Sequence, residues 1–289
     1  MRKIRFFWAL PFVLVPAACA QTPAVLDHFA CYLTPSQPQL PQIAWLQDQF
    51  DVRNNNSVDT IYDIQMLLFC NPTKKTVISA TAPPPTVPIA HPTAHLAMYK
   101  ITEQQAMIPR SVPITNQFGA QTLITGEAEM LAVPSGKSPI PLNGGPVSLP
   151  PVPDPGVLDH FLCYSASGPA INRTVLLNDQ FFVEAPEAAT VLTPRFFCNP
   201  VRKTVLPGSC PAGQFCATQT TPISHPSSHM ACYLMSVKTP FQGIVAYNNQ
   251  FVLPGTLPTA KLTSPVLLCV PSAKSEAWTP IPAPGILTP

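Results

Sequence analysis

Six histidines recur at matched places in the sequence, and imidazole is a common metal ligand and general base. Four of them form two i, i+4 pairs: His91 with His95, and His225 with His229. This spacing joins two zinc ligands only on a helix, and the prolines that follow His91 and His225 disfavour a helix. On a strand, residues i and i+4 lie about 13 Å apart, too far to share one ion. We therefore expect the histidines to be structural, bonding an inward Asp or Asn or a backbone carbonyl.

A metal-assisted hydrolase is the alternative interpretation. It would combine four histidines with the acid or amide that follows each of them: His28, His95, His160 and His229 with Asp48, Asn116, Asp179 and Asn249. However, two of the four positions carry an amide, so a catalytic acid would exist in only half of the units. No Gly-x-Ser-x-Gly, phosphate-binding loop, His-Glu-x-x-His or calcium-loop pattern occurs. The sequence therefore favours a non-catalytic protein without a cofactor.

These residues belong to a unit that occurs four times. Each unit contains His-x-x-Cys-Tyr, then [Asp/Asn]-Gln-Phe, then Cys-x-Pro-x-x-Lys, with substitutions at the cysteines in one unit. The tyrosines of the four units are Tyr32, Tyr99, Tyr164 and Tyr233. The separation from His to the acid or amide is 20, 21, 19 and 20 residues, so the units are true repeats. Odd and even repeats alternate, since only odd repeats begin Leu-Asp-His-Phe and only even repeats begin with a His-Pro segment.

The second repeat decides the disulfide pairing. It has Met98 and Ala132 where the other repeats have cysteines, so both cysteines are lost together. Paired loss is expected if the two cysteines of a repeat bond to each other. The predicted disulfides are Cys31–Cys70, Cys163–Cys198 and Cys232–Cys269, with Cys210–Cys216 closing a short loop. A structural zinc site is disfavoured because no Cys-x-x-Cys pair occurs.

Apolar residues alternate with polar ones before each acid or amide, which indicates strands. Positions −2, −4 and +2 relative to Asp48 are Leu46, Ala44 and Phe50, and the other repeats match. We expect an all-β protein: disulfide-stapled β-sandwich or barrel-like repeats, arranged as two tandem pseudo-twofold domains. The Cys-x-Pro-x-x-Lys segment is expected to leave its strand through a turn that carries a solvated lysine.

The chain divides into five segments. Residues 1–20 have the basic start, apolar run and small-residue end of a signal peptide. Two repeat domains follow, 21–137 (repeats 26–76 and 91–137) and 157–275 (repeats 158–204 and 225–275), with a Pro-rich linker, 138–156, between them and a Pro-rich tail, 276–289. A lipoprotein signal acylated at Cys19 is the rival interpretation, but Pro16 stands where such signals carry Leu.

Composition and charge narrow the partners. Only 10% of residues are charged, against about 25% in typical soluble domains. Residues 1–20 carry three basic and no acidic residues, so the mature chain has 13 basic and 14 acidic residues. A nucleic-acid partner would need clustered Lys and Arg and is not expected. No segment after residue 20 is apolar for long enough to span a membrane.

The motifs LDHFACY, DQF and CNPTKK, repeated as LDHFLCY, DQF and CNPVRK, resemble an uncharacterised repeat family of exported Gram-negative bacterial proteins. The resemblance covers residues 26–275 and implies export and a β-rich repeat, but no reaction. We therefore predict a secreted or surface-associated structural or binding repeat protein, in the cell envelope or outside it, with an unknown extracellular or cell-surface partner. A carbohydrate-binding protein would need exposed aromatic residues, for which Trp45 and Trp278 are candidates.

Overall fold

The structure is a computed structural model that describes residues 26–35, 39–53, 59–78, 88–101, 109–140, 145–154, 156–183, 185–206, 218–252, 255–275 and 279–280. Within these residues the fold is all-β apart from one short helix, α1 (Gln49–Arg53). The predicted signal peptide, Cys19 and the predicted Cys210–Cys216 bond lie outside the described residues. Trp278 lies outside them as well.

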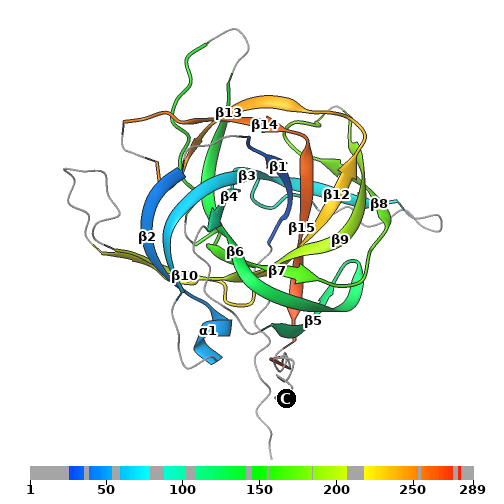
Figure 1. Cartoon of the computed structure of the whole chain (residues 1–289). Coiled ribbons are helices and arrows are strands. Elements are labelled where there is room, and N and C mark those ends of the chain that lie inside the picture. The colour runs from blue at the N-terminus through cyan, green and yellow to red at the C-terminus, as the bar shows by residue number, and fades with distance from the viewer. Residues whose placement is uncertain are drawn as a thin grey trace, which may run out of the picture.

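Eight strands, two from each repeat, form a closed ring (Figure 1). In ring order they are β1 (His28–Leu33), β3 (Asp59–Val77), β4 (His95–Ile101), β6 (Gly119–Pro139), β7 (Phe161–Ser167), β9 (Glu187–Pro200), β12 (His229–Val237) and β15 (Pro265–Lys274). Each strand pairs antiparallel with the next, and β15 pairs back with β1. Because directions alternate, β1, β4, β7 and β12, which begin at or directly after a motif histidine, all start at the same end of the ring.

The two predicted repeat domains correspond to the two halves of this ring. Their strands pair at both seams, β6 with β7 and β15 with β1, so the halves share one sheet. The predicted linker is fastened between them: Ser138 and Pro139 still belong to β6, and Asn248 Nδ2 donates to the carbonyl of Pro150 at 2.9 Å. The linker backbone also passes so close to Gly136 that a Cβ there would lie 2.0 Å from the Pro151 carbonyl oxygen.

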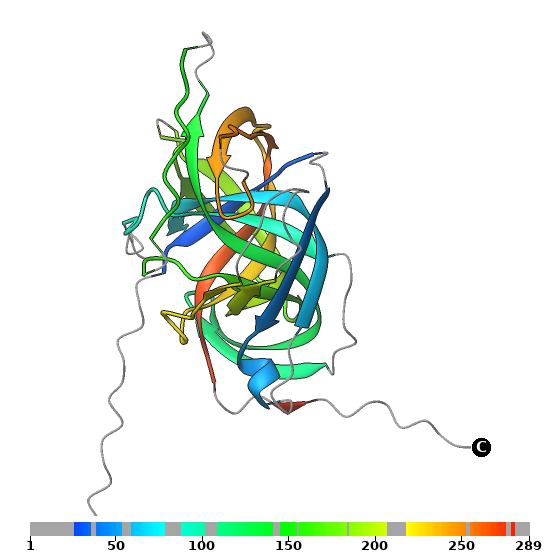
Figure 2. The same cartoon turned by 90° about the vertical axis from the view of Figure 1, so that its left-hand side faces the viewer.

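The remaining strands lie around the ring as arms. Four of them precede the repeated Asp or Asn: β2 (Gln39–Gln47), β5 (Arg110–Asn116), β8 (Arg173–Asn178) and β13 (Gln242–Asn248). The other short strands are β10 (Arg202–Val205), β11 (Gln219–Thr221), β14 (Thr259–Thr263) and β16 (Thr279–Pro280). Figure 2 shows α1 and β16 at one end of the molecule and the end of β6 at the other.

Each repeat lends its arm to the repeat two positions away, which we call the opposite repeat. The residue before the repeated Lys pairs with the residue before the opposite repeat's Asp or Asn: Lys74 with Asn178, Gly136 with Asn248, Arg202 with Gln47, and Ala273 with Thr115. In repeats one, two and four the ring strand therefore continues through the Cys-x-Pro-x-x-Lys segment, and in repeat three only Val201 separates β9 from β10. The expected turn there was wrong. Proline is tolerated at Pro72 because β4, which pairs with β3 only as far as Cys70, has already ended.

The ring interior is a sulfur-rich core. It takes two buried side chains from every ring strand, including all six described cysteines. The disulfides Cys31–Cys70, Cys163–Cys198 and Cys232–Cys269 are present, each between directly opposed residues on neighbouring strands. Met98 and Ala132 oppose each other in the same way in repeat two. The position of the missing disulfide in repeat two is thus a fourth cross-strand pair, occupied by Met98 and Ala132.

A second, larger apolar cluster lies between the ring and its arms. The alternating positions before each Asp or Asn, such as Ala44 and Leu46, belong to it and are buried as the period-two pattern predicts. The four repeated tyrosines point into the same layer, on the face of the ring strands opposite to the cysteines. This layer holds the polar residues that the sequence singled out.

Candidate functional site

Each repeated Asp or Asn first fixes its own turn. One side-chain oxygen accepts the backbone N–H of the Phe two residues later, at 2.6 to 3.0 Å, for Asp48, Asn116, Asp179 and Asn249. Such a contact ends the arm strand in an Asx-turn. These side chains are therefore committed to local structure before any ligand is considered.

Each of them then bonds the tyrosine of the opposite repeat. Tyr32 Oη donates to Asp179 Oδ2 at 2.7 Å, and Tyr164 Oη donates to Asp48 Oδ2 at 2.9 Å. In the even repeats the direction is reversed, because the amide nitrogens of Asn116 and Asn249 donate to Tyr233 and Tyr99 at 2.9 and 2.8 Å. The four contacts join repeat one to three and repeat two to four.

A third partner explains why Asp alternates with Asn. Asp48 Oδ2 also accepts from Asn199 Nδ2 at 2.8 Å, so the odd repeats need an acceptor. Asn249 Nδ2 also donates to Ser135 Oγ at 3.0 Å, so the even repeats need a donor. Burial raises the pKa of Asp48, although hydrogen bonds from Asn199, Phe50 and Tyr164 lower it. The alternation is thus a matching of donors and acceptors.

The repeated lysines do not lie on a solvated turn, contrary to expectation: Lys75 and Lys203 are buried, and Lys137 and Lys274 are half-buried. Each Nζ lies over the Phe ring of the next repeat, 4.0 to 5.0 Å from its centroid: Lys75 over Phe118, Lys137 over Phe181, Lys203 over Phe251, and Lys274 over Phe50. The chain reversal assumed from the sequence does not occur, so the strand carries each lysine under an arm. This places a cation on the face of an aromatic ring.

Only the even lysines find a hydrogen-bond acceptor. Lys137 Nζ donates to Asn71 Oδ1 at 2.7 Å, and Lys274 donates to Gln49 and Asn199. By contrast, Lys75 Nζ and Lys203 Nζ are buried without a hydrogen-bond partner. Burial lowers the pKa of each of these two amines to about 7.

The four motif histidines do not bond the Asp or Asn, contrary to the first of the two expectations. His28 and His160 contact the side chains of Gln117 and Gln250 through Nε2. His95 and His229 face Phe69 and Phe197, with ring centroids 5.8 Å apart in both cases. Burial, reinforced by a nearby lysine, lowers the pKa of His28 and of His229 to about 3 and holds those of His95 and His160 well below the usual value. These imidazoles are neutral packing elements.

The remaining histidines, His91 and His225, lie apart from their i+4 neighbours in two matching turns. The backbone N–H groups of Ala94 and Ser228 donate to the carbonyls of His91 and His225 at 3.1 and 3.0 Å. These are four-residue turns with proline in the second position, where its fixed φ is favoured. Among the described residues, no three His, Cys, Asp or Glu side chains are grouped so that they could hold a metal ion.

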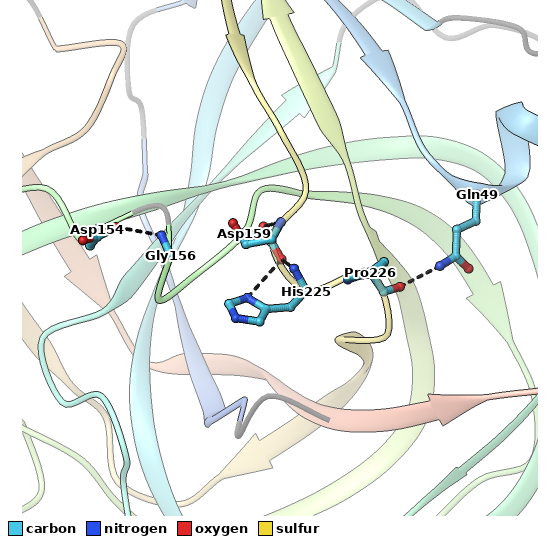
Figure 3. Close-up of polar contacts among 7 residues, drawn as sticks. Gln49, Asp154, Gly156, Asp159, His225 and Pro226 are labelled. Carbon is cyan, nitrogen blue, oxygen red and sulfur yellow. Dashed lines mark hydrogen bonds and ion pairs between the residues drawn. The ribbon is translucent and has the colours of Figure 1, made fainter. Parts of the chain in front are cut away.

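Asp27 and Asp159, which the sequence analysis did not single out, hold these turns. Asp159 accepts the backbone N–H groups of Ser224 and His225 at 2.7 Å each, and its Oδ2 lies 3.3 Å from His225 Nδ1 (Figure 3). Asp27 accepts the N–H groups of Ala90 and His91, also at 2.7 Å. A sequence signal existed: only odd repeats have Asp before the His, and only even repeats have His-Pro.

A cavity of about 390 Å³ lies between the two turns, and we call it the mouth cavity. Its lining comes from the residues that precede ring strands, and it sits over the end of the sulfur-rich core, to which Leu158 and Phe161 belong. The lining residues are Leu26, Ala90, His91, Gly156, Val157, Leu158, Asp159, Phe161, His225 and Ser228. Binding sites are commonly mostly apolar cavities with a few placed polar groups, and the mouth cavity fits that description.

The cavity also contains the ingredients of a hydrolytic triad, but they are not assembled as one. His225 Nδ1 faces Asp159, as in a triad, whereas Ser228 Oγ is buried and makes no hydrogen bond. A nucleophile must lie within hydrogen-bond reach of its base. The arrangement can hold a ligand, and it does not activate the serine.

Comparison with known proteins finds one matching family. Residues 95–270, more than half of the chain, match the family described as a repeat of unknown function (DUF7450). The chain belongs to this family. The DUF7450 match begins at the first residue of β4 and ends within β15, so it spans repeats two to four. No curated protein and no solved structure matches the chain.

Proposed function

We propose that this protein is an exported, non-catalytic repeat protein that serves as a structural or binding module, with the mouth cavity as its ligand site. The observation that supports the proposal most strongly is the set of contacts made by the repeated polar side chains. Every repeated Tyr, Asp and Asn is engaged in a contact between opposite repeats. Side chains that could have served catalysis thus make structural contacts between opposite repeats.

Export is supported by the disulfides, because such bonds persist in oxidising compartments. In the described part of the chain, no helix is long and apolar enough to cross a membrane. A basic, apolar and small-residue leader precedes Gln21 in the sequence. Together these features favour secretion or attachment to the cell surface.

Metal analysis combined with unfolding of the mature chain, residues 21–289, tests the non-catalytic assignment. We expect no stoichiometric metal in the purified protein, and Tyr164→Phe should lower the unfolding midpoint. One zinc per chain, lost together with an esterase or amidase activity in His225→Gln, would contradict it. N-terminal sequencing of the exported protein should give Gln21, whereas a retained Met1 would contradict export through a cleaved signal.

A further inference from the structure

The mouth cavity has one polar group that the fold leaves unused. Ser228 is only 6% exposed, its Oγ has no hydrogen-bond partner, and it lines the cavity. A buried hydroxyl without a partner costs about 1 to 3 kcal/mol, so such a group calls for an explanation. The equivalent residue of repeat two is Ala94, so the protein folds the same turn without the hydroxyl.

The other polar groups of the cavity are acceptors. The Nδ1 atoms of His91 and His225 face the carboxylates of Asp27 and Asp159 at 3.7 and 3.3 Å. An imidazole nitrogen beside a carboxylate carries the proton, which leaves the lone pair on Nε2. The Nε2 atoms therefore offer acceptors on the side turned away from the carboxylates, and the Ser228 hydroxyl can accept as well.

The charge of the cavity points the same way. Asp159 is 4% exposed and is itself part of the lining, and Asp27 supports the other turn at 6% exposure. No lysine or arginine is among the residues that line the cavity. The Asp159 carboxylate, which accepts two backbone N–H groups and faces His225 Nδ1, gives the lining a negative charge that attracts a cation.

From these features we infer that the mouth cavity binds a small organic amine, held by Ser228, the imidazoles and Asp159, with its apolar body against Leu26 and Val157, accessible apolar residues of the lining. An ammonium group supplies three donors to a site made of acceptors. A volume of about 390 Å³ suits a ligand the size of an arylalkylamine. Because Ser228 has no counterpart in repeat two, one ligand binds per chain, in one orientation. The inference rests on the proposal that the protein is a binding module.

Calorimetric titration of the mature protein at about pH 8, where an alkylamine is protonated, tests the ligand class. The probes are 2-phenylethylamine, the neutral 2-phenylethanol and the anionic phenylacetate, which share one apolar body. We expect one saturable amine site, with the alcohol bound about tenfold more weakly, as expected for loss of a hydrogen bond to a charged group, and no saturable binding of phenylacetate. Equal binding of all three probes, or none, would overturn the inference.

Two variants locate the site. Ser228→Ala should weaken 2-phenylethylamine binding about tenfold, whereas the control Ser236→Ala, at an exposed position of the following strand β12, should change nothing. Ala90→Phe fills the cavity without removing a polar group and should abolish binding. Ser228→Ala should not lower the unfolding midpoint, because no hydrogen bond is lost.

The outcomes separate the two proposals. If the alcohol binds as tightly as the amine and Ala90→Phe abolishes both, the amine class is wrong while the mouth remains a binding site. If amine binding survives both variants, the mouth cavity is not the site. Recovery of 2-phenylethylamine unchanged is expected, and its conversion to a product would contradict the non-catalytic assignment while leaving the site in place.

Discussion

Tyr32 donates a hydrogen bond to Asp179 at 2.7 Å although the two residues are 147 positions apart in the chain. Tyr164 and Asp48 make the reciprocal contact, 116 positions apart. The two contacts tie the first repeat to the third in both directions. Because each carboxylate is almost completely buried, the stability of the ring should depend on its hydroxyl partner.

Tyr164→Phe should lower the free energy of unfolding by about 2 kcal/mol, because it leaves a buried carboxylate short of one donor. Chemical denaturation of the mature chain measures the change. The control is Tyr62→Phe, at an exposed tyrosine of β3, which should alter stability by less than about 0.5 kcal/mol. Equal effects at the two positions would contradict a specific role for the Tyr164–Asp48 contact.

A fourth disulfide should form in repeat two of the double variant Met98→Cys, Ala132→Cys. The two residues oppose each other as Cys31 and Cys70 do. For a loop of this length the chain-entropy estimate is about 4 kcal/mol, offset by loss of the buried Met98 side chain. Thiol counting and unfolding under oxidising conditions give the result. The single variant Met98→Cys is the reference, because it includes most of the packing loss without a disulfide. Two freely titrating thiols in the double variant would show that this position is not equivalent to the disulfide positions of the other repeats.

Stability should rise with pH between about 7 and 10.5 because of the buried odd lysines. Burial lowers the pKa of Lys203 to about 7 in the folded chain, while an unfolded lysine titrates near 10.5. Between these values the unfolded state binds more protons, so raising the pH favours the fold. Lys203→Met should raise stability at pH 7 and flatten this slope. Lys100→Met, at an exposed lysine, should leave the slope unchanged, and an unaltered slope in Lys203→Met would refute the assignment.

The two halves of the ring should not fold independently. A fragment of residues 21–137 leaves β1 and β6 without the partners β15 and β7. Unpaired edges on a half-open core are unfavourable and prone to association. We expect each half to be unfolded or aggregated alone and the two to recover native circular dichroism when refolded together. A cooperatively folded monomeric half would contradict the shared sheet.

The strands and the disulfide pairing could be predicted from the sequence, whereas the contacts between repeats could not, for physical reasons. Repeat two lacks both cysteines, at Met98 and Ala132. Because losing only one would leave a reactive free thiol, this joint absence identifies the two cysteines of each remaining repeat as bonded partners. Period two identified the arm strands. The sequence does not indicate which repeat supplies the partner of Tyr32, because the four repeats are so similar that each offers an Asp or Asn at the same position. The odd–even alternation suggested neighbouring pairs, whereas the contacts run between opposite repeats.

The lysines show the same limit. Lysine is usually solvated, and no residue pattern indicates that the arm of another repeat covers Lys75 and Lys203. Asp27 and Asp159 escaped notice because their partners are backbone N–H groups, which leave no trace in side-chain patterns. The mouth cavity depends on four segments from separate repeats, and only the folded ring brings them together.

Pairing of the first ring strand with the last fixes the copy number. An open array of repeats can gain or lose one unit. In this ring every strand edge is already paired, so a fifth repeat could not be inserted without breaking a strand pair. Removing a repeat would leave two strands with unpaired edges. A chain with a single odd–even pair could complete the same ring only by pairing with a second copy of itself.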